Sequence, residues 1–86
     1  MYDVVLSAEV EEIYTSADQA LAKKIARCLE YLEQNPRFHP NIKSLKGDLA
    51  GYYRYRIGNY RVIYQIDDDA NQVIVNTIVH RREAYE

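Results

Sequence analysis

The stretch YYRYRIGNYRVIYQI, residues 52–66, decides the fold. Two β-rich segments, 52–57 and 60–66, flank Gly58-Asn59, a dipeptide typical of a tight β-hairpin. A two-residue loop pairs position 57 with 60, 56 with 61, and 54 with 63. Because side chains alternate between the two faces of a sheet, the hairpin separates its residues into two distinct sets.

One set is apolar or aromatic, and we expect it to lie under the helices: Tyr53, Tyr55, Ile57, Tyr60, Val62, Tyr64 and Ile66. The other set, which we call the arginine face, holds Tyr52, Arg54, Arg56, Arg61, Ile63 and Gln65. Arg56 is expected directly opposite Arg61, where like charges destabilise a strand pair. A solvated face with splayed side chains is one interpretation. A phosphate-binding surface is favoured, because arginine forks match phosphate oxygens and tyrosine can stack on a base.

Residues 72–81, QVIVNTIVHR, predict a third strand after the polar turn DDDAN at 67–71. If position 66 pairs with 72, the arginine face also receives Val73, Val75, Thr77, Val79 and Arg81. Arg81 would then lie at its rim. His80 would point to the opposite face, where a structural role is favoured over a catalytic one.

The N-terminal half predicts one strand and two helices. Residues 2–6 are β-rich, and Ser7 is a plausible N-cap for a helix with Val10, Ile13 and Tyr14 on one face. Ser16, with Gln19 three residues later, fits a capping box that would open the second helix. That helix carries one apolar stripe: Leu21, Ile25, Cys28, Leu29 and Leu32. It should stop at Asn35, before Pro36, and residues 36–51 are expected to be mostly loop.

The expected fold is therefore α+β, a single domain spanning 1–86 with the order β-α-α-β-β-β. A helical hairpin would pack on one face of a mainly antiparallel sheet. The chain has 86 residues, of which 48% are hydrophobic and 28% charged, as in ordinary globular domains. We expect no signal peptide or membrane span, because the N-terminus soon turns acidic and no apolar run is long enough.

The single cysteine, Cys28, lies on the apolar helical stripe, so a buried structural thiol is favoured over a nucleophile. One cysteine cannot form an internal disulfide, which suits a reducing, cytoplasmic location. No metal or cofactor is expected. The two histidines, His39 and His80, are far apart in sequence, DDDAN lacks the spacing of a calcium loop, and no glycine-rich phosphate loop is present.

The charge distribution is uneven. The formal net charge is −2, which alone argues against nucleic-acid binding. Residues 37–64, however, carry six basic side chains against one acidic, whereas both flanking segments are acidic. A local basic patch can bind phosphate on an acidic protein, because salt limits the reach of distant charges to about 8–10 Å.

Three segments resemble the RelE toxins of bacterial and archaeal toxin–antitoxin systems: NPR after the second helix, SLKGDLAGYYRYRIGNYRVIYQIDDD, and IVHRREAY at the C-terminus. The resemblance covers essentially the whole chain. It implies the toxin of a type II system, a metal-independent endoribonuclease that cleaves mRNA in the ribosomal A site. A 2′-hydroxyl would attack the adjacent phosphate and leave a 2′,3′-cyclic phosphate.

The resemblance also implies the catalytic residues, which match Arg54, Arg56, Arg61, Arg81 and Tyr85 of this chain. Arg61 would stabilise charge on the phosphate, Arg81 would interact with the leaving 5′-oxygen, and Tyr85 would stack on a base or orient the substrate. Some members of the family carry lysines where this chain has Arg54 and Arg56. Because arginine stays protonated, we expect electrostatic stabilisation and orientation to carry most of the rate; alternatively, Tyr85 or a ribosomal group helps to take the proton.

The implied partners are an acidic RelB-like antitoxin, the 30S A site with its mRNA, and operator DNA contacted through the antitoxin. A basic middle segment suits an acidic partner. Two alternatives remain open. One is a ParE-like toxin of the same fold that poisons DNA gyrase, and the other is a non-catalytic RNA-binding module.

Overall fold

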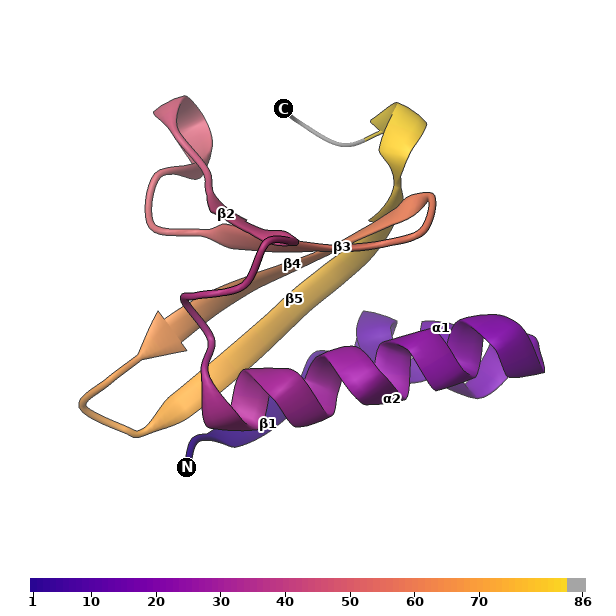
Figure 1. Ribbon diagram of the computed structural model, residues 1–86, viewed down its shortest axis with the longest axis horizontal. Helices are drawn as coiled ribbons and strands as arrows, with labels where there is room; N and C mark the ends of the chain where they lie inside the picture. The colour runs from indigo at the N-terminus through magenta and orange to yellow at the C-terminus, as the bar shows by residue number, and fades with distance from the viewer. Residues whose placement is uncertain (84–86) are drawn as a thin grey trace.

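The computed structural model describes residues 1–83, in which two helices cover one side of a five-stranded sheet (Figure 1). Along the chain the elements are β1 (Asp3–Leu6), α1 (Ala8–Ser16), α2 (Gln19–Gln34), β2 (Ile42–Ser44), β3 (Tyr53–Ile57), β4 (Tyr60–Asp67) and β5 (Gln72–His80). Two short 3₁₀ turns, η1 (Gly47–Leu49) and η2 (Arg81–Glu83), complete the list. The sheet order is β1-β5-β4-β3-β2, with β1 parallel to β5 and the other pairs antiparallel. The predicted α+β class is confirmed.

The two helices begin at side-chain caps. Ser7 caps α1 as predicted, and its hydroxyl accepts a hydrogen bond from the Val10 amide at 3.1 Å. The capping box at Ser16 is wrong: the cap of α2 is Asp18, whose carboxylate accepts from the Leu21 amide at 2.8 Å. The Ser16 hydroxyl instead donates to the Glu12 carbonyl, 2.9 Å away inside α1. Asp and Ser are about equally good caps. Asp18 caps α2 because it directly precedes the first residue of that helix, whereas Ser16 still belongs to α1.

The core lies between α2 and the sheet. The predicted stripe of α2 buries Ile25, Cys28 and Leu32 completely or almost so. Burial raises the pKa of the Cys28 thiol to about 12, so this cysteine is an inert core residue. On the sheet side, Tyr64 is fully buried and its hydroxyl donates to the Pro36 carbonyl at 2.7 Å. That hydrogen bond ties β4 to the segment that follows α2.

The hairpin of β3 and β4 has the predicted register. Ile57 pairs with Tyr60, Arg56 with Arg61, and Arg54 with Ile63. Gly58 has a φ of +60°, a backbone conformation that residues with a side chain rarely adopt. This explains glycine at the first position of the turn.

The register of β5 differs from the prediction by one residue before a bulge and by two residues after it. Ile66 pairs with Val73, and a bulge inserts Asn76 between the Tyr64–Val75 and Ile63–Thr77 pairs. Val73 and Val75 therefore face the core and are fully buried, so their assignment to the arginine face is wrong. Beyond the bulge the alternation is reversed. Thr77, opposite Ile63, and Val79, opposite Arg61, lie on the arginine face as predicted.

Strand β2 was not anticipated, because residues 36–51 were expected to be mostly loop. Its three residues pair with β3, placing Ile42 opposite Tyr55, Lys43 opposite Arg54 and Ser44 opposite Tyr53. A three-residue edge strand is too short to show a period-2 pattern in sequence. It nevertheless extends the sheet by one strand on the side of the arginines.

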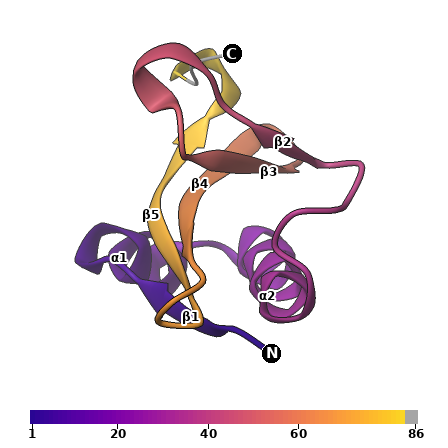
Figure 2. The same cartoon turned by 90° about the vertical axis from the view of Figure 1, so that its left-hand side faces the viewer.

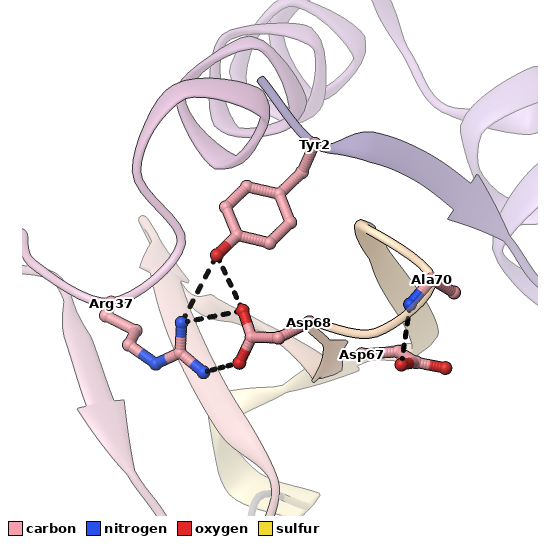
Figure 3. A network of polar contacts seen from close by, with 5 residues as sticks. All are labelled: Tyr2, Arg37, Asp67, Asp68 and Ala70. Carbon is pink, nitrogen blue, oxygen red and sulfur yellow. Dashed lines mark hydrogen bonds and ion pairs between the residues drawn. The ribbon is translucent and has the colours of Figure 1, made fainter.

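The turn between β4 and β5 is held to the rest of the chain by an ion pair (Figure 3). The Arg37 guanidinium donates to both carboxylate oxygens of Asp68, at 2.7 and 3.3 Å. The Tyr2 hydroxyl donates to the same carboxylate at 2.7 Å. These hydrogen bonds lower the pKa of Asp68, the Arg37 contact having the larger effect. Three segments distant in sequence are thereby joined.

The two sides of the sheet have different neighbours. Both helices lie on one side, whereas η1 and η2 rise from the other (Figures 1 and 2). Within residues 1–83, neither helix is long and apolar enough to cross a membrane.

Candidate nucleic-acid interface

The arginine face lies on the side of the sheet away from the helices. Arg56 of β3 pairs directly with Arg61 of β4, and Arg54 lies two residues along β3 on the same face. Arg54 and Arg61 are only 8% and 7% exposed, whereas Arg56 is exposed. The structure thus places the three arginines at neighbouring positions of one face, as the sequence predicts.

Backbone contacts position the two arginines of β3. The Arg54 Nη1 donates to the Asn41 carbonyl at 2.8 Å, and the Arg56 amide donates to the same carbonyl at 3.0 Å. Asn41 immediately precedes β2, so the unpredicted edge strand helps to orient the Arg54 side chain. The Arg61 Nη1 makes a long contact of 3.5 Å with the Tyr60 carbonyl.

Arg81 lies just beyond the end of β5, in η2. Its amide donates to the Asn59 carbonyl at 2.6 Å, which fixes its backbone beside the hairpin turn and near the start of β4. Its side chain is exposed. The predicted rim position is therefore compatible with the fold. Tyr85, the remaining predicted catalytic residue, lies outside the described residues.

Both histidines have structural contacts. The His80 ring packs edge-on against Tyr60, with centroids 5.4 Å apart, and its Nδ1 accepts from the Arg82 amide at 3.3 Å. His39 stacks on Tyr55 at 5.0 Å and accepts from the Asn41 amide at 2.9 Å. Among residues 1–83, no group of three His, Cys, Asp or Glu side chains could hold a metal ion.

Sequence analysis missed one cation of this surface. Lys43 pairs directly with Arg54, so it belongs to the same face, and it is exposed. The sequence gives no signal for this residue, because Lys43 can be assigned to a face only once β2 is known. The arginine face therefore carries Lys43, Arg54, Arg56 and Arg61, with Arg81 near the hairpin turn.

Such a surface can bind a phosphate from several sides. Arginine forks donate paired hydrogen bonds to phosphate oxygens, and charge-assisted bonds of this kind are roughly twice as strong as neutral ones. The same donors can stabilise a phosphorus centre that gains negative charge in a transition state. Burial of Arg54 and Arg61 reduces screening by solvent and strengthens this interaction.

Comparison with known proteins identifies the class. Residues 4–85 match the family model described as the ParE toxin of the type II toxin–antitoxin system parDE. The toxin RelE of Mycobacterium tuberculosis is 40% identical over 72 residues, which cover 78% of this chain and 72% of that protein. The chain is a toxin of type II toxin–antitoxin systems and belongs to the RelE/ParE superfamily, as a RelE-type member.

Solved structures agree with this assignment. The RelE–RelB complex of Pyrococcus horikoshii has a toxin chain with a TM-score of 0.82 and 25% identity, covering 96% of this chain and 98% of that one. The RelBE toxin–antitoxin complex of Mycobacterium tuberculosis gives a TM-score of 0.78 and 25% identity, with 93% and 98% covered. Both relatives were solved together with an antitoxin.

Proposed function

We propose that this toxin is a ribosome-dependent endoribonuclease that cleaves mRNA in the A site and so inhibits translation. The observation that carries the proposal is the arginine face, where Arg56 directly opposes Arg61 and Arg54 lies beside them. Like charges in register destabilise a strand pair, so a polyanionic ligand explains their position better than stability does. A ribosomal target implies action in the cytoplasm.

The reaction is a transesterification within the RNA. The 2′-oxygen attacks the adjacent phosphorus, the bond from phosphorus to the 5′-oxygen breaks, and a 2′,3′-cyclic phosphate forms. The 2′-hydroxyl loses its proton and the leaving 5′-oxygen gains one. No metal or cofactor takes part in the proposed mechanism.

Each site residue has a role in this scheme. Arg61 stabilises the negative charge that develops on the phosphate, and Arg81 donates to the leaving 5′-oxygen. Arg54 and Arg56 hold the phosphate in position, since arginine stays protonated and is unsuited to act as a base. Tyr85 stacks on a base or orients the substrate.

The proposed physiological partner is an acidic, RelB-like antitoxin that neutralises the toxin by covering or distorting the arginine face. The solved relatives in complex with RelB support this choice. Contact with operator DNA would be made by the antitoxin within the complex. Charge complementarity favours such a partner, because residues 37–64 are strongly basic.

A second candidate is a ParE-like toxin that poisons DNA gyrase, favoured by the description of the matching family model. The occupied basic positions on both hairpin strands argue for the ribonuclease. A third is a non-catalytic RNA-binding module.

One experiment separates the three. Purified toxin is added to ribosomes stalled with a defined codon in the A site, and mRNA ends are mapped by primer extension; gyrase supercoiling is assayed in parallel. Cleavage within the A-site codon is the expected result. Intact mRNA with inhibited supercoiling would establish the gyrase poison instead, and intact mRNA with active gyrase would favour the binding module.

A further inference from the structure

One row of side chains crosses the sheet on the arginine face. Lys43 of β2 is opposite Arg54 of β3, which is opposite Ile63 of β4, which is opposite Thr77 of β5. Directly opposed residues project to the same face, so the row is continuous from the β2 edge to β5. Only its β2 and β3 members are charged.

The far end of this row is acidic. The Thr77 hydroxyl donates a hydrogen bond to the Glu9 carboxylate, which lies in the first turn of α1. On the neighbouring row, Arg56 and Arg61 are followed on β5 by the uncharged Val79. The face is therefore cationic over β2, β3 and β4. Over β5, Thr77 and Val79 are neutral, Arg81 follows the end of the strand, and a carboxylate lies beyond the Thr77 end of the row.

This polarity gives a nucleic-acid strand a preferred direction. Neighbouring strands are about 4.8 Å apart and residues rise about 3.4 Å along a strand, so Lys43 on β2 and Arg61 on β4, two strands across and two residues along, are roughly 12 Å apart. That spacing is comparable with the screening length of about 8–10 Å, so Lys43 and Glu9 both act on a phosphate chain bound at the centre. The Lys43 ammonium attracts the chain toward β2, and the Glu9 carboxylate repels it from the Thr77 end of this row.

We propose that the bound RNA crosses the sheet over β4, β3 and β2, and that Lys43 binds a backbone phosphate next to the scissile one. This inference rests on the proposed function. Lys43 is a binding residue here and takes no part in bond breaking. A lysine suits this position because its compact charge on a flexible stem can follow a phosphate whose orientation is not fixed.

The first test measures binding to ribosomes programmed with mRNA whose scissile nucleotide is 2′-deoxy, so that the attacking hydroxyl is absent. Dissociation constants are determined against salt for the wild type, Lys43→Gln and the control Lys23→Gln, whose exposed side chain lies on α2. Lys43→Gln should lower the slope of log Kd against log salt by about 0.7, the value for one phosphate of a single strand. The control should leave the slope unchanged. On cleavable mRNA, Lys43→Gln should raise KM and spare kcat.

The second test identifies which RNA is bound. Single linkages on either side of the scissile phosphate are replaced by uncharged methylphosphonates. One replacement should weaken binding of the wild type while having no further effect on Lys43→Gln. If every replacement affects both proteins equally, Lys43 contacts ribosomal RNA or nothing, and the inference is overturned.

The remaining outcomes separate this inference from the proposed function. Normal binding by the wild type with equal slopes for Lys43→Gln and Lys23→Gln would overturn the role of Lys43 alone. A wild-type toxin that neither binds nor cleaves mRNA on programmed ribosomes would overturn the proposed function, and this inference with it.

Discussion

Each face of the β3–β4 hairpin holds nearly buried side chains, and the chemistry of these side chains is opposite on the two faces. On the core face Tyr55 and Ile57 are 8% and 6% exposed, and on the arginine face Arg54 and Arg61 are 8% and 7% exposed. Burial of the apolar side chains stabilises the fold by roughly 1.5–3 kcal/mol for a large residue. Removing a guanidinium from water costs free energy instead, and an adjacent like charge adds to that cost.

The comparison shows that burial alone does not identify a stabilising residue. The core face is expected to control stability, and the arginine face to control activity at some expense of stability. Substitutions on the two faces should therefore have effects of opposite sign on the free energy of unfolding.

The largest effect is expected for activity at Arg61. Arg61→Ala should reduce the rate of A-site mRNA cleavage about 10²–10³-fold, the usual result of removing one donor that stabilises transition-state charge. The control is Arg27→Ala, which removes an exposed guanidinium from α2 on the helical side of the molecule. Full toxicity of Arg61→Ala in cells that accumulate folded protein would show that the site is elsewhere.

On the core face, Tyr64→Phe should lower the free energy of unfolding by about 1–3 kcal/mol, because the buried Pro36 carbonyl loses its donor. Urea denaturation followed by circular dichroism measures this difference. Tyr55→Phe is the matched control, since it removes a hydroxyl from the same face at the edge of the core. Equal stability of Tyr64→Phe and wild type would contradict the structural role of this hydrogen bond.

On the arginine face, Arg56→Gln should raise the free energy of unfolding by about 0.2–1 kcal/mol, because it relieves repulsion from Arg61 directly opposite. Arg27→Gln changes the net charge equally without touching the sheet and should have a smaller effect. The same Arg56→Gln protein should cleave mRNA more slowly. A destabilised Arg56→Gln variant would mean that Arg56 supports the fold. It would contradict the expectation that substitutions on the two faces change the free energy of unfolding in opposite directions.

The smallest effect is expected at Asp68, whose ion pair with Arg37 is exposed to solvent. The pKa of Asp68 is lowered from 3.8, so the stabilisation is present above that value and is lost as the pH falls toward the lowered pKa. Thermal melts of wild type and Asp68→Asn should differ near neutral pH and converge in acid. High salt should also reduce the difference in melting temperature between wild type and Asp68→Asn, because it screens the exposed ion pair. A difference that persists at a pH well below 3.8 would require another explanation.

Local patterns predicted the helices and the hairpin well. The Gly58-Asn59 turn and strict alternation around it are enough to pair Arg56 with Arg61, because a two-residue loop leaves one register. The α2 stripe and the stop before Pro36 follow from periodicity and steric rules. The cap of α2 was assigned to Ser16 instead of Asp18, because both residue types are good caps.

Longer-range pairing was predicted less well. Asp67 pairs with Gln72, which shortens the expected turn by one residue and places Val73 and Val75 in the core. The bulge at Asn76 then reverses the alternation, and no local signal in β5 indicates an extra residue there. Lys43 joined the arginine face only through β2, whose three residues show no pattern of their own. The site was therefore predicted for the arginines of one hairpin and incompletely beyond it.

By itself, the sequence determined the two helices, the hairpin and the gathering of Arg54, Arg56 and Arg61 on one face, because these depend on neighbours within a few residues. The tertiary structure alone decided that Lys43 extends this cationic face and that Glu9 bounds it. Those placements depend on pairing between segments distant in sequence. Such pairing is fixed by the burial of the whole sheet rather than by any local pattern.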